Sequence, residues 1–196
     1  MTLPAGLLSS QPEEPHVAQT LATANINLGF LTILQESSGF LGGYLVTNQW
    51  GRPLEFRLST AVQPNRIHQI LYGQTLQGYL AGELIGKTLV EKSAAQAQFI
   101  ITDHADALHL RPHVSTPVLL SRSAPEDSIE RDPLVCVRPS ENKKPAIYGH
   151  AGYPEDRAAV LDLLERYEGG MDLAEPFARI REAIGEARKM GVTARG

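Results

Sequence analysis

The stretch Pro53-Leu54-Glu55-Phe56-Arg57-Leu58-Ser59-Thr60-Ala61-Val62 decides the fold class of this chain. Apolar and polar side chains alternate through its first half, and a β-strand, which repeats every two residues, places the two kinds on opposite faces. We expect the apolar face of this strand to pack on the core. After Gln63-Pro64-Asn65 the apolar spacing changes to that of Ile67, Ile70 and Leu71, which we expect on the core-facing side of a helix. The change of period from 2 to 3.6 at a proline indicates a mixed α/β protein.

Other strands and helices are indicated on both sides of this stretch. Short loops join it to the two apolar segments that precede it, which predicts a three-stranded antiparallel meander. A helical region is then expected from a cap at Thr75 to about Lys92, and a central strand and a late hairpin follow it. The remaining expected strands lie at 28–34, 41–47, 99–103, 114–120, 134–137 and 146–148.

Composition along the chain suggests three parts: a flexible, proline-containing leader (1–25), an α/β core domain (26–150) and a C-terminal helical hairpin (151–196). The expected fold is thus α/β of the α+β type, with the meander followed by helices and a further central strand. In the hairpin, Asp172 and Glu175 have the spacing of a capping box. The hairpin is expected to pack on the core or to extend from it, because an amphipathic helix normally buries its apolar stripe.

The overall composition is that of an ordinary globular protein. The chain has 196 residues, 42% of them hydrophobic, and a formal net charge of −4. This charge argues against a general nucleic-acid partner, since phosphate binding needs clustered Lys and Arg. Cys136 cannot form an internal disulfide and is expected to be buried. No secretory signal and no apolar run of the ~20 residues that span a bilayer is present, so a cytoplasmic protein is expected.

A glycine-rich segment allows two interpretations. Residues 81–88, Ala-Gly-Glu-Leu-Ile-Gly-Lys-Thr, resemble a relaxed phosphate-binding loop, but no buried strand precedes them as that motif requires. Gly78, Gly82 and Gly86 recur at every fourth residue, which on a helix makes a bare stripe where another backbone can pack closely. Glu83 and Lys87 have the spacing of a helix ion pair. The sequence leaves open whether that pair is structural.

The order of the expected elements carries a resemblance. Three strands, then a helix, then a strand that ends in Asp103 resemble the ribonuclease H-like order of elements. This resemblance covers residues 28–103 and implies a magnesium-dependent phosphodiesterase, because acidic residues from the first strand, the first helix and the fourth strand hold two Mg²⁺ ions in that fold. Glu36, Glu83 and Asp103 stand at roughly those places in this sequence.

Histidines provide a weaker candidate for a metal site. His104, His109 and His113 follow the expected central strand, and zinc requires three or four converging ligands. Pro112 and the neighbouring apolar residues favour an extended chain here. In an extended chain His104 and His109 point to opposite faces, so histidines that bind no metal are the expectation.

The leading functional interpretation from sequence is a non-enzymatic intracellular module that binds a protein or assembles with itself, and that needs no cofactor. It rests on the lack of catalytic motifs and on an exposed-looking loop, with Trp50, Arg52 and Arg57 as partner-binding candidates, since Trp and Arg are favoured interface anchors. Trp50 fits a core position equally well. The alternative is the ribonuclease H-like phosphodiesterase that uses Glu36, Glu83 and Asp103.

Overall fold

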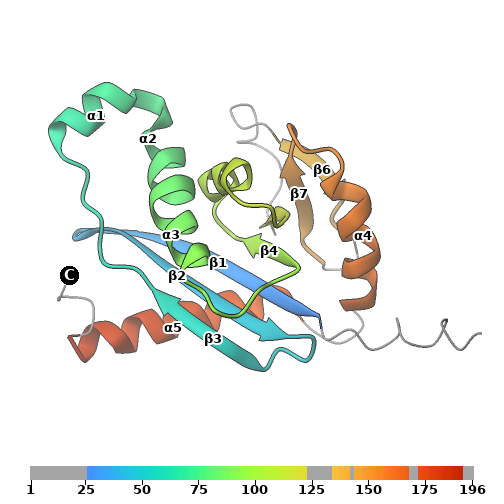
Figure 1. The fold of residues 1–196 in the computed structure, drawn as a ribbon. Coiled ribbons are helices and arrows are strands. Elements are labelled where there is room, and N and C mark those ends of the chain that lie inside the picture. Colours follow the sequence, from blue (N-terminus) through green and yellow to red (C-terminus); the bar gives the residue numbers. More distant parts are fainter. Residues whose placement is uncertain (1–25, 123–133, 142–143, 168–171, 192–196) are drawn as a thin grey trace, which may run out of the picture.

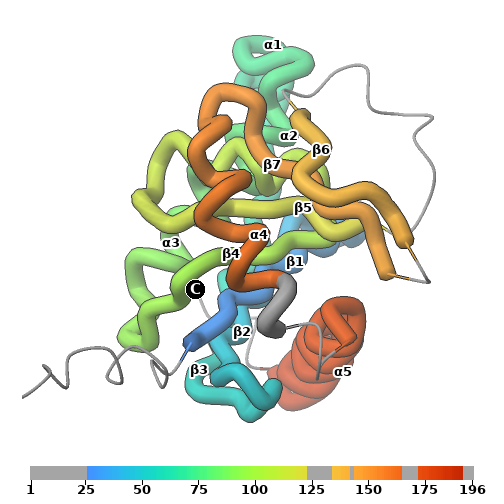
Figure 2. Tube along the Cα trace, turned by 90° about the vertical axis from the view of Figure 1, so that its right-hand side faces the viewer, coloured from blue at the N-terminus to red at the C-terminus, as the bar shows by residue number. Residues whose placement is uncertain are grey.

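The computed structural model describes residues 26–122, 134–141, 144–167 and 172–191. These residues form a seven-stranded sheet with helices on both of its faces (Figures 1 and 2). The sheet has the order β3-β2-β1-β4-β5-β7-β6. Its strands are β1 (Asn27–Glu36), β2 (Gly39–Asn48), β3 (Pro53–Leu58), β4 (Phe99–Thr102), β5 (Val118–Arg122), β6 (Leu134–Arg138) and β7 (Ala146–His150). The mixed α/β fold class predicted from the sequence is confirmed.

The pairing of the strands confirms the predicted meander and the late hairpin. β2 is antiparallel to both β1 and β3, whereas β4 is parallel to β1 and β5 is parallel to β4. β7 pairs antiparallel with β5 and with β6. Parallel strands end at the same edge of a sheet, so the residues that follow β4 lie beside the second half of β1.

Short helical segments connect β3 to β4 and β4 to β5, and those from Leu76 onward cover one face of the sheet. They pack Leu80, Ile85 and Leu108 against Leu31 and Ile33 of β1. The segments are α1 (Arg66–Tyr72), η1 (Gly73–Thr75), α2 (Leu76–Gly78), η2 (Tyr79–Gly86), α3 (Lys87–Glu91) and η3 (Ala105–His113). We call this side of the sheet the η2 face.

Two C-terminal helices cover the opposite face, which we call the α5 face. α4 (Asp156–Tyr167) and α5 (Glu175–Lys189) contribute Val160, Phe177 and Ile180 to a core that includes Leu28 and Phe30 of β1. The Phe177 ring meets that of Phe30 edge to face, with centroids 5.6 Å apart. None of the helices that the structure describes is long and apolar enough to cross a membrane.

The predicted glycine stripe is a close packing surface. A Cβ atom on Gly82 would lie 2.5 Å from the carbonyl carbon of His109 and 2.6 Å from the amide nitrogen of Leu110. On Gly78 it would meet the His109 ring at 2.4 Å. The stripe therefore lets η3 lie directly against η2. Residues 81–88 are helical, so their N–H groups do not form a phosphate-binding loop.

The helical region differs in register from the prediction. Tyr79–Gly86 is a π-helix, in which Lys87 N–H bonds to Gly82 O, five residues back. A helical wheel with 3.6 residues per turn therefore places the side chains of this segment at the wrong angles. Lys87 pairs with Glu91 at 3.8 Å, and Thr75 makes no cap hydrogen bond through its side chain.

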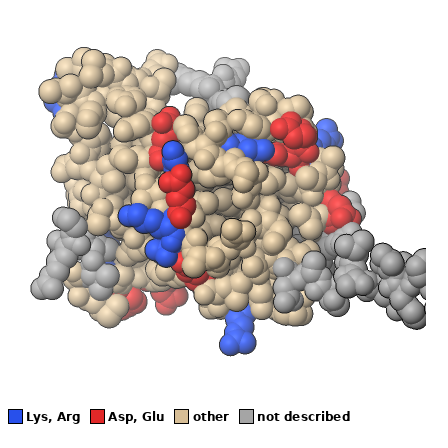
Figure 3. Space-filling model, in the orientation of Figure 1, with Lys and Arg blue, Asp and Glu red and all other residues tan. Residues whose placement is uncertain are grey.

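Several burial predictions are wrong. Ile67, Ile70 and Leu71 of α1 were expected on the core but are 64%, 66% and 75% exposed. These residues do follow the helical period, but α1 projects from the body of the molecule and contains no buried residue (Figure 1). Figure 3 shows this lobe almost without charged side chains. Cys136 was expected to be buried, yet it is exposed, because β6 is the end strand of the described sheet.

The apolar side of β3 is only partly covered. Leu54 and Phe56 are 48% and 39% exposed, although the alternation predicted them on the core. The opposite, polar side is the better anchored one. Glu55 accepts hydrogen bonds from the backbone N–H groups of Ala94 and Ala95 and from the Ser93 hydroxyl, at 2.7–2.9 Å.

Candidate functional site

Asp103 lies directly after β4 and is held from two sides. The parallel register pairs Leu31 with Thr102, so Thr32 of β1 comes next to Asp103. The Thr32 hydroxyl donates a 2.6 Å hydrogen bond to Asp103 Oδ1, and Arg181 Nη2 of α5 donates to Oδ2. The carboxylate therefore has a fixed orientation on the α5 face, just beyond the point where the parallel pairing of β1 and β4 ends.

The exposures of these groups differ in a way that matters for chemistry. The Asp103 side chain is 17% exposed, whereas the Arg181 side chain is 49% exposed. Thr32 is completely buried. A ligand that approaches from solvent would meet the guanidinium first and the carboxylate behind it. We call Thr32, Asp103 and Arg181 the Asp103 site.

Glu36 lies on the same face but further along β1. It follows Thr32 by four residues, which is about 13 Å at the rise of a strand. It pairs with Arg188 of α5, which also donates a 3.2 Å hydrogen bond to the Ser38 hydroxyl. Glu36 and Asp103 are therefore two separate ties between α5 and the edge of the sheet.

Glu83 lies on the other side of the sheet. It belongs to η2, whose apolar residues pack on the η2 face, whereas the Asp103 site faces α5. It faces His113, with 3.6 Å between Glu83 Oε1 and His113 Nε2. The structure does not bring Glu36, Glu83 and Asp103 together.

This separation decides whether the residues fit the magnesium centre that the resemblance implies. Two Mg²⁺ ions about 4 Å apart need carboxylates that converge on one point. Among the described residues no group of three or more His, Cys, Asp or Glu side chains could hold a metal ion. The three predicted carboxylates do not fit a two-ion centre.

The three candidate histidines also diverge. Residues 105–113 form a 3₁₀ helix rather than the extended chain that was expected. His104 Nδ1 is 3.7 Å from Asp106, and His113 faces Glu83. His109 packs its ring on Gly78. They do not converge on one ion.

A buried ion pair that sequence reasoning missed joins η3 to α4. Arg111 donates from Nε and Nη2 to the two carboxylate oxygens of Asp156, at 2.6 and 2.9 Å, and from Nη1 to Val114 O. Its guanidinium lies 4.0 Å from the centroid of the Tyr153 ring. The hydrogen bonds to Asp156 raise the pKa of Arg111. Because every oxygen and the ring face are already used, this cluster is a clamp rather than a ligand site.

His150 stands beside this clamp. Burial lowers its pKa, and the nearby charges of His109 and Arg111 lower it further. Its ring meets that of Tyr153 edge to face at 5.3 Å. No local motif signals the approach of His150 to His109 and Arg111, because these two residues precede it in the chain by 41 and 39 positions.

The partner-binding candidates lie near the β2–β3 connection. Trp50 is 74% exposed, so its alternative core position is wrong. Arg52 is exposed as well. Arg57 pairs with Glu55 of its own strand, with 2.6 Å between Nε and Oε1. Arg179 of α5 donates to Gly51 O and holds this connection against the helix.

No protein-family model matches this chain, and no curated protein matches it. Among solved structures, the chain is similar to an endonuclease V from Bacillus subtilis, with 8% sequence identity and a TM-score of 0.38. The match covers 63% of this chain and 64% of that one, less than two thirds of its length. This finding stands against the predicted non-enzymatic binding or assembly module, and that interpretation is withdrawn. A likeness this weak carries no further argument.

Proposed function

We propose that the protein is a ribonuclease H-like phosphodiesterase that cleaves nucleic acid at the Asp103 site, with Asp103 as a general base in place of the two-ion centre that the resemblance implies. The observation that supports this most is the position of Asp103. It directly follows the strand that pairs in parallel with β1, in a sheet whose first three strands form an antiparallel meander. That is the element order on which the resemblance rests.

The Asp103 site contains groups that this chemistry can use. A backbone phosphate would draw the half-exposed Arg181 guanidinium away from the carboxylate, because guanidinium pairs well with phosphate oxygens. Asp103 Oδ2 would then accept a proton from a water molecule whose oxygen attacks phosphorus. The ester P–O bond breaks on the far side, and the leaving oxygen takes a proton from solvent. Thr32 keeps Oδ1 in place throughout.

The surface charge constrains the substrate. On the face that Figure 3 shows, Lys and Arg are mixed with Asp and Glu and form no broad basic area. Binding through one or two phosphate contacts gives a shallow dependence of affinity on salt. We therefore expect a short or single-stranded substrate. A cytoplasmic location belongs to the same proposal.

The test is a cleavage assay on short labelled DNA and RNA, single-stranded and duplex, without added metal and with Mg²⁺ or Mn²⁺. Asp103→Asn should lower the rate at least about 100-fold, the scale of one general base. Glu91→Gln is a matched control, because Glu91 pairs with Lys87 on the exposed side of α3. Absence of cleavage in every condition, or an Asp103→Asn variant as fast as the parent, would overturn the proposal. Melting temperatures show whether each variant is folded.

A further inference from the structure

In the part of the chain that the structure describes, the edge of β3 that faces away from β2 is open. β3 is the end strand of the sheet that the structure describes. The backbone N–H of Ser59 donates to Gly42 O of β2. Because the hydrogen-bonding direction alternates along an antiparallel strand, the backbone N–H and C=O groups of Glu55 and Arg57 also point toward β2. The backbone N–H and C=O groups of Leu54, Phe56 and Leu58 consequently point to the open side.

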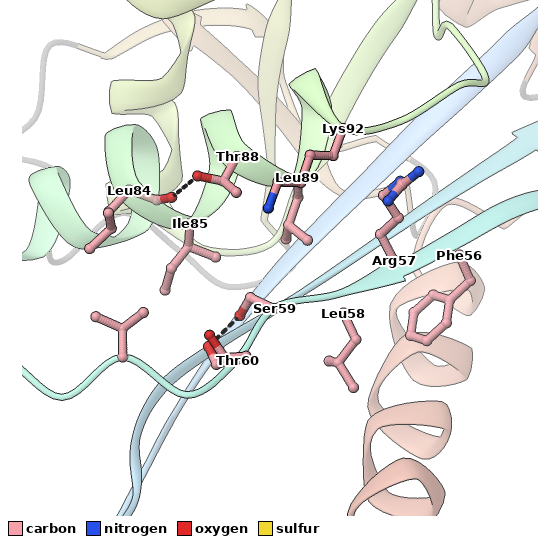
Figure 4. A pocket seen from close by; sticks show the side chains of 11 residues that line it. Phe56, Arg57, Leu58, Ser59, Thr60, Leu84, Ile85, Thr88, Leu89 and Lys92 are labelled. Atoms are coloured by element: carbon pink, nitrogen blue, oxygen red, sulfur yellow. Dashed lines mark hydrogen bonds between the residues drawn. The ribbon is translucent and has the colours of Figure 1, made fainter. Parts of the chain in front are cut away.

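The space beside this edge is also open. A groove of about 560 Å³ lies between the end of β3 and the helices η2 and α3 (Figure 4). Leu84, which lines it from η2, is 38% exposed. On the α5 face, Leu54 and Phe56 add exposed apolar surface to the same edge. An edge strand with exposed apolar side chains is a template for pairing with another strand.

We propose that a second copy of this chain pairs with this edge, β3 against β3, in an antiparallel register centred on Phe56. The sequence Leu54-Glu55-Phe56-Arg57-Leu58 reads as apolar, acidic, apolar, basic, apolar, and reversing its direction exchanges the acidic and the basic position. Centred on Phe56, it places Glu55 of each copy opposite Arg57 of the other and the leucines opposite each other. Moving the centre to Glu55 or Arg57 puts like charges face to face, which is destabilising.

The hydrogen-bonding pattern selects the same register. In this pairing the outward groups of Leu54, Phe56 and Leu58 meet the outward groups of Leu58, Phe56 and Leu54 in the other copy. Each outward N–H thus finds a C=O. The charged pairs then occupy the positions between hydrogen-bonded pairs, where side chains lie closest. Two-fold symmetry is the usual arrangement for soluble homo-oligomers. The inference is independent of the proposed function.

The test measures the mass of the full chain by sedimentation and light scattering over roughly 1–100 μM, the range of a modest affinity. We expect twice the chain mass of 21.4 kDa at the upper end. Phe56→Lys should weaken association at least tenfold, since two lysines would meet at the centre of the pair. Ile70→Lys is the matched control, because Ile70 is 66% exposed on α1, and it should leave association unchanged.

A second variant and an amide exchange measurement test the same dimer if Phe56→Lys destabilises the fold. Arg57→Glu should weaken association at low salt and recover part of it at high salt, because the new like-charge pairs are screened. The amides of Leu54, Phe56 and Leu58 should exchange more slowly at higher protein concentration. A monomer throughout, a dimer that survives Phe56→Lys, or amide protection independent of concentration would overturn the proposal. The last outcome would mean that another segment of the same chain covers the edge.

Discussion

Gly82→Ala is the sharpest test of the packing between η2 and η3. An alanine in an unobstructed helix position gains about 0.5–1 kcal/mol over glycine. Here the new Cβ would lie 2.5 and 2.6 Å from backbone atoms of His109 and Leu110, which cannot move aside as the end of a side chain can. Overpacking of this kind costs about 1–3 kcal/mol. We expect a net destabilisation of up to roughly 2.5 kcal/mol, since the obstruction is backbone and its cost exceeds the gain from alanine.

The chain offers two graded controls for this substitution. At Gly185 of α5 a Cβ would meet nothing within 4 Å, so Gly185→Ala should stabilise the protein by about 0.5–1 kcal/mol. At Gly78 the obstruction is the His109 ring, which can rotate, so Gly78→Ala should lie between the two. Urea unfolding followed by circular dichroism gives the three free energies. If Gly82→Ala stabilises the protein as Gly185→Ala does, the close approach of η3 is refuted.

Three further predictions concern charged groups. Asp156→Ala should cost about 3–5 kcal/mol in urea unfolding, because it leaves Arg111 buried without its partner; Arg111→Met in the same chain should restore most of the loss. The lowered pKa of His150 stabilises the protein above its unfolded pKa of about 6.5, and this contribution is lost as pH falls below that value, so His150→Asn should flatten the dependence of the urea midpoint between about pH 7.5 and 5.5. The pKa of Glu55 is lowered mainly by the Ala95 N–H, so its contribution is present above about pH 4.3 and lost on further acidification; acid unfolding of Glu55→Gln should lack that component.

The sequence pattern was sufficient to predict those strands and helices in which burial determines the spacing of the apolar residues. β1, β2 and β4 are buried on both faces or nearly so, and their apolar runs were visible as strands. The face of α5 that carries Phe177, Ile180 and Ile184 was also predictable, because those residues follow the helical period and are buried.

Periodicity did not reveal what each stripe would contact. The apolar residues of α1 have the right spacing for a helix, but the helix projects from the body of the molecule. β3 has the period of a strand, but its polar side is the one held by hydrogen bonds. The reason at β3 is that Glu55 satisfies backbone amides of a loop 40 residues away, which no local pattern encodes. The clamp of Arg111 and Asp156 spans 45 residues in the same way.

The candidate site was only partly predictable for a similar reason. Asp103 was found because it directly follows an apolar strand, and a strand end is a feature of local sequence. Its partners were not, because Thr32 and Arg181 reach it through the parallel register and the docking of α5. Glu83 was misplaced because element order alone does not say which face of a sheet a helix covers.

The π-helical segment Tyr79–Gly86 has a consequence for how insertions and deletions act on this chain. A π-helix holds more residues per turn than an α-helix, so the segment accommodates an extra residue while largely preserving the phase of the helix beyond it. Removing one residue from it would permit ordinary α-helical bonding and leave Leu89 facing the core, whereas removing one residue from an α-helix turns everything beyond by about 100°. The segment thus works as a spacer that keeps the phase between two halves of one helix. A single deletion there should be less damaging than a single deletion in α5 before Ile184, which would turn Ile184 out of the core.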